Sequence, residues 1–281
     1  MDNFCERTEM LQPEPARALG ALLGVPVPDL ARGEGLPLLW HWMYLLDRPA
    51  QADLGPDGHP LSGTIAAFPG LGRRRMWAGG RVRARGRLRC GDLATKRSRL
   101  LIVQEKQGRS GPLTFITVEH QILQHDHVVL DEEQDFVYRE TASPAGHLSA
   151  PSGDGPAVGP ADGEWAIEVS PTLLFRFSAL TYNAHRIHYD RDYAMHVEGY
   201  PGLLTHGPLQ ALAMAEAARA AGYRGDQDDG RLHFDYRLTS PLFDYQGMMV
   251  SAVREQDAMM TAVRDSRGRQ TAAGTLQNAS Q

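Results

Sequence analysis

Cysteines and long apolar runs are scarce in this sequence. The first scarcity argues against disulfide-stabilised and zinc-binding proteins, and the second against membrane-spanning ones. Only two cysteines, Cys5 and Cys90, occur in 281 residues. They lack CxxC spacing and histidine partners, so the sequence predicts neither a disulfide framework nor a zinc site. No apolar run approaches the roughly 20 residues that span a bilayer, and the start, MDNFCERTEM, lacks the layout of a signal peptide. We therefore expect a cytoplasmic protein with no membrane partner.

The chain also lacks a basic excess and several catalytic motifs. Its formal net charge is -5, spread along the sequence, so the charge does not favour nucleic acid as a partner. The sequence contains no GxSxG elbow, no GxxxxGK[ST] phosphate loop and no GxGxxG after a strand. Serine hydrolysis, nucleotide hydrolysis and dinucleotide redox chemistry are therefore not predicted.

The clearest break in the chain is the segment of residues 141–165, TASPAGHLSAPSGDGPAVGPADGEW. Proline, glycine, serine and alanine replace any periodic pattern there, which is typical of a linker. The sequence thus predicts a first domain of residues 1–140 and a second of residues 166–281. Hydrophobic residues make up 42% of the chain, enough for one small core in each half.

Both halves favour a helix followed by antiparallel strands. In the first half, residues 15–23 predict a short helix that begins with proline, and the apolar aromatic run 36–46 suits a buried strand. Residues 53–63, DLGPDGHPLSG, predict a long irregular connection, a kind of segment that is often functional. In the second half, a strand over 174–180 precedes a helix over about 208–221. Further strands are expected at residues 81–88, 94–104, 113–123, 128–139, 231–238, 248–255, 259–265 and 272–277. The order indicates α+β architecture, with each helix on one sheet.

Proton-exchanging side chains are densest in residues 175–194, FRFSALTYNAHRIHYDRDYA. Asn183 and His188 lie five positions apart, with His185 between them and Asp190 just after. A lone histidine is more often structural, but one with a pKa near neutrality can take a proton from water and return one to carbon. Asp190 can instead form a surface salt bridge or a helix cap.

A helix start follows this segment at His206 and Gly207, just before Pro208. The free N–H groups and the dipole of a helix N-terminus favour negative charge that develops on an oxygen. A carbonyl at this helix start would lie near Asn183 and His188. The combination predicts addition of water to, or its loss from, a carbon next to a thioester.

These motifs carry a resemblance to a known family. SALTYNAHRIHYDRDYA resembles the hydratase signature of hotdog-fold (R)-specific enoyl-CoA hydratases of the MaoC-like group, in which an aspartate precedes a histidine by five positions. Asn183 and His188 occupy those places. LLTHGPL resembles the His-Gly helix start of the same group, whose backbone amide polarises the thioester carbonyl, and this assigns that role to Gly207. LPLLWHWMYLLD, LGPDGHPLSG, RRRMWAGGRVR, GRSGPLTFITVEHQI and EEQDFVYRE resemble the N-terminal region of type 2 hydroxyacyl-thioester dehydratases, which include mesaconyl-C4-CoA and itaconyl-CoA hydratases.

The resemblance implies two fused hotdog domains, each a central helix wrapped by an antiparallel sheet. The second domain would be catalytic, and the first would complete the substrate tunnel. The substrate would be the coenzyme A thioester of a short branched dicarboxylic acid, hydrated to citramalyl-CoA in the breakdown of itaconate or a related dicarboxylate. No metal or redox cofactor is implied, and the resemblance allows a homodimer.

The implied catalytic roles fall on the residues of the two motifs. The N–H of Gly207 would stabilise the enolate-like oxygen, and His188 would carry the proton transfers. Asn183 would hold the water, because an amide cannot act as a general base. His185 or Asp190 would orient His188 or supply the second proton.

Two arginine groups are candidates for binding the substrate. Arg74 and Arg75 precede Trp77, and Arg109 follows in the turn KQGRSG. Each is either a solvated face or a group that grips coenzyme A phosphates or a substrate carboxylate, since arginine pairs bidentately with both. Trp77, Tyr182 and His206 complete the expected substrate-binding set, although a packing role is the more ordinary one for Tyr182.

Other interpretations stay open at this stage. The turn at residues 57–59 is ordinary turn chemistry first and a lid second. Residues 40–42 are core residues or line an acyl pocket. The rival functions are a thioesterase, a 3-hydroxyacyl-thioester dehydratase that acts on linear chains carried by acyl-carrier protein, and a non-catalytic acyl-CoA binding protein.

Overall fold

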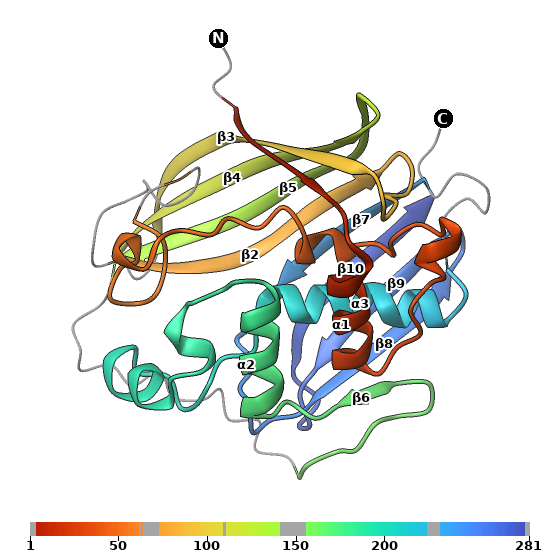
Figure 1. Cartoon of the computed structure of the whole chain (residues 1–281). Helices are drawn as coiled ribbons and strands as arrows, with labels where there is room; N and C mark the ends of the chain where they lie inside the picture. The colour runs from red at the N-terminus through yellow and green to blue at the C-terminus, as the bar shows by residue number, and fades with distance from the viewer. Residues whose placement is uncertain are drawn as a thin grey trace.

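The computed structural model describes residues 4–61, 63, 73–108, 111–140, 156–223 and 231–278. A ten-stranded antiparallel sheet dominates it, in the order β1-β3-β4-β5-β2-β7-β10-β9-β8-β6 (Figure 1). Its strands are β1 Cys5–Met10, β2 Arg73–Ala84, β3 Leu93–Gly108, β4 Gly111–Gln124, β5 His127–Glu140, β6 Trp165–Ile167, β7 Leu232–Leu238, β8 Met248–Glu255, β9 Ala258–Arg264 and β10 Gln270–Asn278. The α-helices are α1 Pro13–Leu23, α2 Pro171–Leu180 and α3 Gly207–Ala220. The 3-10 turns are Leu30–Arg32, Trp40–Met43, Gln51–Asp53 and Arg186–His188, and Tyr193–Val197 is a π-helix.

The two halves of the chain meet at strands β2 and β7. The five strands before the expected linker form one side of the sheet, and the five after it form the other. Residues Gly79 to Ala84 of β2 pair with Arg237 to Leu232 of β7, so the sheet is continuous across the joint. The division into domains at residues 141–165 stays a prediction, because residues 141–155 lie outside the described ranges.

Eight of the ten strands expected from the sequence are present, as β2 to β5 and β7 to β10. The boundaries shift most at β2, which begins at Arg73 and ends at Ala84. Between β4 and β5, His125 and Asp126 both have positive φ, at 49° and 62°, as a tight two-residue hairpin requires. The sequence did not predict β1, a mostly exposed edge strand without apolar alternation, or the three-residue β6.

The expected strand over residues 36–46 is wrong. This segment contains the 3-10 turn Trp40–Met43, and Leu39 and Leu45 have positive φ, at 67° and 54°, which an extended strand does not contain. The residues are buried as expected, with Trp40 wholly inaccessible. A short apolar run therefore gave the burial correctly but not the backbone conformation, which periodicity alone does not distinguish.

The expected strand over residues 174–180 is also wrong, since this segment lies in helix α2. Ser170 caps the helix by accepting a hydrogen bond from the N–H of Leu173 at 3.2 Å, and Pro171 occupies the first helical position. Leu174, Phe177 and Ser178 are buried on one face, with helical spacing. The Ser-Pro start was the local signal for a helix.

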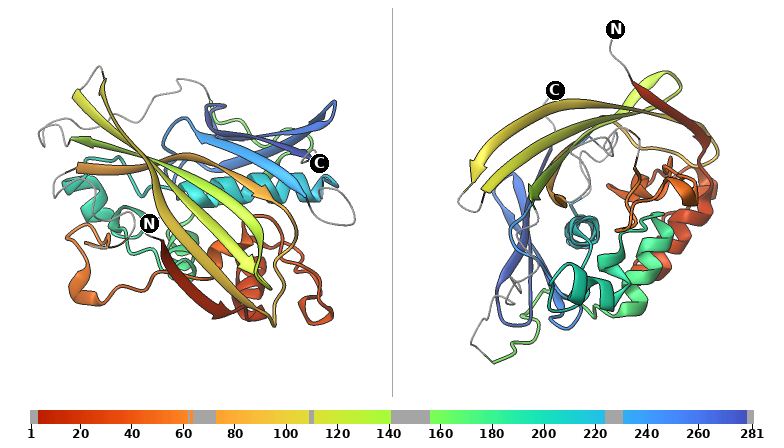
Figure 2. Two further views of the ribbon diagram at one scale, coloured as in Figure 1. Left: turned by 90° about the horizontal axis from the view of Figure 1, so that it is seen from above. Right: turned by 90° about the vertical axis from the view of Figure 1, so that its left-hand side faces the viewer.

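Helix α3 lies in the curve of the sheet, as the end-on view in Figure 2 shows. It packs against β8, β9 and β10, and small alanines let the strands approach closely. It confirms the predicted helix over about 208–221. In the first half, α1 packs against α2 and the Trp40–Met43 turn. Two side chains of this turn, His41 and Trp42, bond to Glu132 of β5.

A buried carboxylate fixes that turn to the sheet. Glu132 on β5 pairs with Nε2 of His41 at 2.9 Å and accepts hydrogen bonds from Trp42 Nε1 at 2.8 Å and Gln134 Nε2 at 2.7 Å. Burial raises the pKa of Glu132, but the hydrogen bond and charge of His41 outweigh this effect and lower the pKa to about 2. His41 and Trp42 belong to the irregular segment and both bond to Glu132, so this carboxylate connects that segment to the sheet.

Among the described residues, no helix combines the length and apolar character needed to cross a membrane.

Candidate active site

Two segments of the second half bring the predicted catalytic residues together. The first is the loop of residues 181–188, and the second is the approach to α3, residues 204–207. The N–H of Leu204 donates to the carbonyl of Ile187 at 3.0 Å, which holds the segments side by side. His188 is thereby placed next to the first turn of α3, as the sequence motifs predict.

His188 is held in one tautomer by the second segment. Its Nδ1 lies 2.7 Å from the carbonyl oxygen of Leu204, and because a carbonyl only accepts, Nδ1 carries the proton and Nε2 is free to accept one. Burial lowers the pKa of His188 to about 4, against the raising effect of the bond to Leu204. His188 is therefore a neutral base near pH 7.

His206 stacks directly on His188. The ring centroids are 3.6 Å apart with an interplanar angle of 19°, and Nε2 of His206 lies 2.9 Å from Oγ of Ser178. Burial lowers the pKa of His206 well below its ordinary value, and the neighbouring His188 lowers it further. His206 is the residue before α3 and is fully buried, so it forms the back of the site.

Gly207 is the first residue of α3, as predicted. N–H groups in the first turn of a helix have no carbonyl partner within the helix. A Cβ at this position would lie 2.3 Å from Cδ1 of Leu238 and 3.6 Å from Cβ of Trp77. Leu238 and the predicted substrate residue Trp77 therefore lie against the helix start, and a side chain at position 207 would have to displace that of Leu238.

Asn183 shapes the loop that carries His188. Its Oδ1 accepts a hydrogen bond from the N–H of His185 at 3.0 Å, which forms an Asx turn. Tyr182, just before it, has φ 53° and is 52% exposed, so it is not a packed core residue. His185 is buried, and its ring centroid lies 5.5 Å from that of His188 at 89°.

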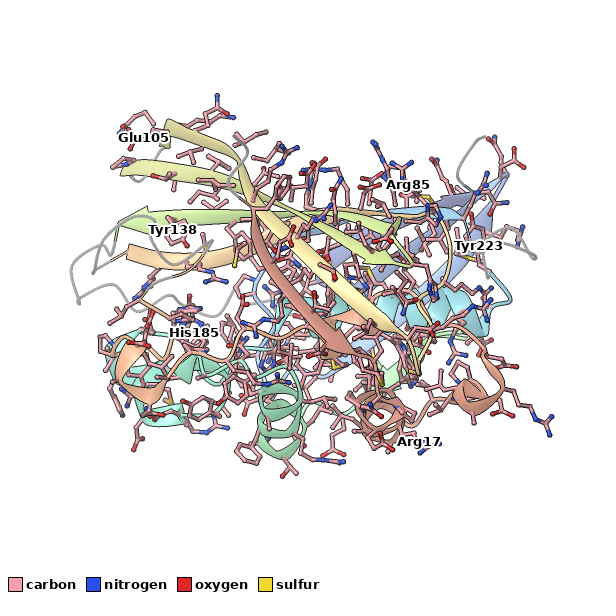
Figure 3. The ribbon with its side chains drawn as sticks, turned by 45° about the horizontal axis from the view of Figure 1, so that its top comes forward. Arg17, Arg85, Glu105, Tyr138, His185 and Tyr223 are labelled. Carbon is pink, nitrogen blue, oxygen red and sulfur yellow. The ribbon has the colours of Figure 1, made fainter. Side chains whose placement is uncertain are left out.

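The sequence did not identify a contribution from the turn of residues 57–59. His59 lies with its ring centroid 4.0 Å from that of His185, and its Nδ1 is 2.9 Å from Oδ2 of Asp57. The only local signal was the unusually long irregular connection DLGPDGHPLSG. The contact joins positions more than a hundred residues apart in sequence, which periodicity does not predict. In Figure 3, His185 lies at the end of the molecule that also holds Tyr138 of β5.

Arg75 of β2 faces the same cluster. Its guanidinium lies 4.6 Å from the ring centroid of Phe136 and bonds to Tyr138. Burial lowers the pKa of Arg75, while Tyr138 and the charge of Asp57 raise it. The charge of Arg75 in turn lowers the pKa of His59, after the larger effect of burial. Among the predicted arginines that the structure describes, Arg75 is therefore the one whose charge acts on His59 and His185.

The remaining residues of the predicted site make contacts outside the histidine cluster or lie outside the described residues. Nε of Arg74 pairs with Glu198 at 2.8 Å, and the Arg74 guanidinium lies over the ring of Tyr200 at 5.5 Å. Asp190 pairs with Nη2 of Arg186 at 2.8 Å and accepts from the N–H of Tyr193 at 3.0 Å. Asp190 thus has both structural roles considered for it, a salt bridge and a helix cap. Arg109 lies outside the described residues.

Asp57, His59 and His185 also have the composition of a cation site. One ligand atom from each lies within 4.8 Å of the other two. The hydrogen bond from His59 Nδ1 to Asp57 accounts for the closest pair without a metal. The prediction that no cofactor is needed stays a prediction.

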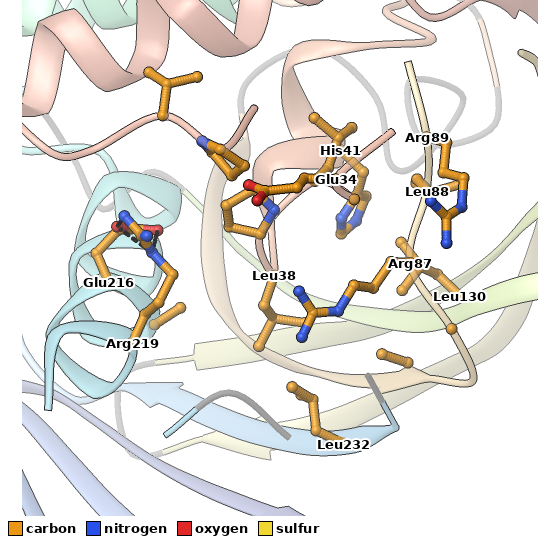
Figure 4. Close-up of a pocket in the computed structure, with 18 of the residues that line it drawn as sticks. Glu34, Leu38, His41, Arg87, Leu88, Arg89, Leu130, Glu216, Arg219 and Leu232 are labelled. Atoms are coloured by element: carbon orange, nitrogen blue, oxygen red, sulfur yellow. Dashed lines mark hydrogen bonds and ion pairs between the residues drawn. The ribbon is translucent and has the colours of Figure 1, made fainter. Parts of the chain in front are cut away.

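A cavity of about 600 Å³ opens at the opposite end of α3 (Figure 4). Glu216 and Arg219 of α3 form an ion pair at its wall, at 2.6 Å. Arg87, Arg89 and Leu38 line other sides. None of the described residues of the predicted site lines this cavity, so it is separate from the histidine cluster.

The comparisons with known proteins agree with the geometry. Residues 39–244 match the family model for hydroxyacyl-thioester dehydratase type 2. The chain is 44% identical over 244 residues to the mesaconyl-C(4)-CoA hydratase of Chloroflexus aurantiacus, and the alignment covers 85% of this chain and 83% of that protein. The crystal structure of HtdX from Mycobacterium tuberculosis has a TM-score of 0.67 at 14% identity, covering 98% of this chain and 100% of that one. A further protein of Mycobacterium tuberculosis, reported to have a double hotdog fold, has a TM-score of 0.56 at 15% identity, covering 98% of this chain and 94% of that one.

These likenesses confirm two predictions made from the sequence. The structural neighbours confirm the double hotdog fold. The family match and the sequence relative confirm an enzyme of the hydratase and dehydratase class that acts on acyl thioesters. The chain belongs to the hydroxyacyl-thioester dehydratase type 2 family.

Proposed function

We propose that this enzyme adds water to the C=C bond of a short branched dicarboxylyl-CoA, mesaconyl-C4-CoA or itaconyl-CoA, to give citramalyl-CoA. The observation that carries the chemistry is the placement of His188. Its Nδ1–H is tied to the Leu204 carbonyl, and its ring stacks on His206, the residue just before Gly207. A neutral base and an open helix N-terminus therefore lie side by side.

The reaction follows from this arrangement. The thioester oxygen lies against the N–H of Gly207, where the helix dipole favours developing negative charge. Asn183 positions a water, and Nε2 of His188 takes one proton from it as the water oxygen bonds to the β-carbon. In mesaconyl-C4-CoA, whose C=C bond is conjugated with the thioester, the C=C electron pair moves toward the thioester oxygen and forms an enolate. A proton delivered to the α-carbon completes the addition. In itaconyl-CoA the C=C bond lies one carbon further away, so a proton shift that brings it into conjugation has to come first.

The preference for a dicarboxylyl chain is supported by Arg75. Arg75 and Trp77 are two residues apart on β2 and share a face, and Trp77 lies beside Gly207. Two residues of strand span roughly 7 Å, comparable to the length of a four-carbon dicarboxylyl group. A thioester at Gly207 thus directs its free carboxylate toward Arg75. The name of the relative from Chloroflexus aurantiacus points to the same substrate class.

The biological setting stays a proposal from the sequence. It consists of itaconate or related dicarboxylate breakdown, a cytoplasmic location, a homodimer and no cofactor beyond the coenzyme A thioester. Tyr182 and Arg109 keep their expected roles in substrate binding on the same basis.

The test is hydration of mesaconyl-C4-CoA, itaconyl-CoA and crotonyl-CoA, a thioester without a second carboxylate. Loss of ultraviolet absorbance reports the conjugated enoyl-thioesters, product mass reports itaconyl-CoA, and a thiol reagent reports hydrolysis. The proposal expects a gain of one water on the dicarboxylyl substrates without free thiol. Turnover of crotonyl-CoA alone would replace the proposal with a linear-chain dehydratase, and release of thiol would indicate a thioesterase.

Variants connect this activity to the site. His188→Ala is expected to lower kcat by about 10²-fold or more while the protein stays folded, since that is the usual range for loss of an acid–base group. The matched control is His125→Asn in the β4–β5 turn, where the side chain is 73% exposed and asparagine tolerates the positive φ. Near-normal activity of His188→Ala would remove His188 from the mechanism.

A further inference from the structure

We propose that Asp57 and His59, from the first half of the chain, form a second acid–base pair of the active site. In this pair His59 is the catalytic acid that protonates the α-carbon of the substrate, and Asp57 orients it. This inference rests on the proposed function and assigns the second proton of that reaction. Position 183, where the resembling hydratases carry an aspartate, holds an amide, which cannot act as an acid or base. The inference finds the second acid–base group in the first hotdog half instead.

The pair is built for proton transfer. Oδ2 of Asp57 accepts from Nδ1 of His59 at 2.9 Å, and Oδ1 of Asp57 accepts from the backbone N–H of His59 at 3.0 Å. Both carboxylate oxygens therefore bind the same residue. The arrangement fixes the tautomer of His59, leaves its Nε2 for the substrate, and stabilises the imidazolium form, as a carboxylate does for a catalytic histidine.

The turn is docked on the catalytic loop rather than lying over it as a free lid. The N–H of Arg186 donates to the carbonyl of Asp57 at 2.9 Å, and Nη1 of Arg186 donates to the carbonyl of Pro56 at 3.0 Å. Gly58 has φ 88°, and a Cβ there would lie 1.8 Å from the carbonyl oxygen of Ala184. The turn can approach this closely only because residue 58 is glycine.

The surroundings separate the two histidines into an acid and a base. His188 has no carboxylate partner among the residues that the structure describes, and burial lowers its pKa to about 4. Burial also lowers the pKa of His59, but the hydrogen bond that His59 donates to Asp57 opposes the shift. The hydrogen-bond partners differ, because Nδ1 of His59 bonds to a carboxylate, which stabilises an imidazolium, whereas Nδ1 of His188 bonds to a neutral carbonyl. This geometry assigns the acid role to His59 and the base role to His188.

The proton balance of hydration is then complete. Nε2 of His188 takes the proton from water as the C–O bond forms. The imidazolium of His59 gives its Nε2 proton to the α-carbon as the enolate collapses, which leaves His59 neutral and His188 protonated. The proton then has to pass from His188 back to His59, and the ring of His185 contacts both, with centroid distances of 5.5 Å to His188 and 4.0 Å to His59. Dehydration runs the same transfers in reverse.

The charged groups that face His59 come from three segments. Asp57 belongs to its own turn, Arg75 projects from β2, and His185 belongs to the catalytic loop. Burial and then the charge of His59 lower the pKa of His185 well below its ordinary value, so His185 stays neutral while His59 holds the proton. Arg75 disfavours the imidazolium, and a substrate carboxylate paired with Arg75 would remove much of that effect.

The experiment measures kcat/KM against pH for wild type, Asp57→Asn, His59→Gln and the control His125→Asn, on mesaconyl-C4-CoA and crotonyl-CoA. His59→Gln is expected to lose about 10²-fold in kcat with little change in KM. In Asp57→Asn, His59 loses the group that raises its pKa, so the alkaline fall in activity moves to lower pH. Added imidazole is expected to restore part of the activity of His59→Ala.

Each outcome decides between distinct ideas. An unshifted alkaline limb in Asp57→Asn, or near-normal kcat in His59→Gln, overturns the acid–base role while the hydratase stands. Loss of wild-type activity on treatment with EDTA and its recovery with Zn²⁺ would overturn it in favour of a metal site at Asp57, His59 and His185. A wild-type enzyme without turnover on any thioester overturns the proposed function, and the role of the pair with it.

Discussion

Lowering the pH from 7 to 5.5 should leave the rate of hydration undiminished, because burial keeps the base, His188, unprotonated over this range. Burial lowers the pKa of His188 from 6.5 to about 4. At pH 5.5 a histidine of pKa 6.5 is about nine-tenths protonated, whereas one of pKa about 4 is protonated to roughly 3%. An ordinary histidine base would thus lose about tenfold in kcat/KM over this range, and His188 would lose almost nothing.

The assay is the initial rate of loss of enoyl-thioester absorbance between pH 4.5 and 8 at low substrate concentration. The acidic limb of kcat/KM reports the essential base of the free enzyme. A limb centred near 6.5 would refute the reasoning, because it would mean that the functional base is exposed to water.

Acid unfolding must be separated from this limb. Because the folded pKa of His188 lies below the unfolded value, the unfolded chain binds more protons between pH 6.5 and about 4, and stability falls as the pH drops through that window. The difference between the two pKa values corresponds to about 3 kcal/mol for complete protonation. Samples held at low pH and assayed at pH 7 show whether a loss of rate is unfolding or titration.

Three further predictions follow from the same structure. In wild type, protonation of Glu132 should remove part of the folding stability as the pH falls from 4.5 toward about 2. Glu132→Gln should lose this part of the pH dependence, because the carboxylate that pairs with His41 is gone. Urea titrations at several pH values would contradict this if variant and wild type lost stability in parallel. Ser178→Ala should lower kcat severalfold with KM kept, since it frees the ring of His206, and steady-state kinetics would reject the idea if only KM changed. Gly207→Ala keeps the backbone N–H but places a Cβ 2.3 Å from Cδ1 of Leu238, so it should lower kcat, by up to about 10²-fold, by shifting that N–H away from the thioester oxygen; near-normal kcat in a variant that is folded by circular dichroism would contradict this.

The sequence by itself determined the features that depend on neighbouring residues. The strands β7 to β10 and the start of α3 at Gly207 were predicted to within a few residues, because alternation and the His-Gly-Pro helix start are local signals. The spacing of Asn183 and His188 likewise selected a loop that the structure places at the start of α3. Local signals failed where an apolar run fits two conformations, as at Trp40–Met43.

Tertiary structure alone decided which distant groups share the site. Arg74 and Arg75 are adjacent in sequence, yet Arg74 pairs with Glu198 while Arg75 faces the histidines. The approach of His59 to His185 depends on the fit of Gly58 against the loop, a contact between the two halves of the chain. Hydrophobic periodicity specifies which face of an element is buried but not which element it meets, because that choice depends on the packing of the whole sheet around α3.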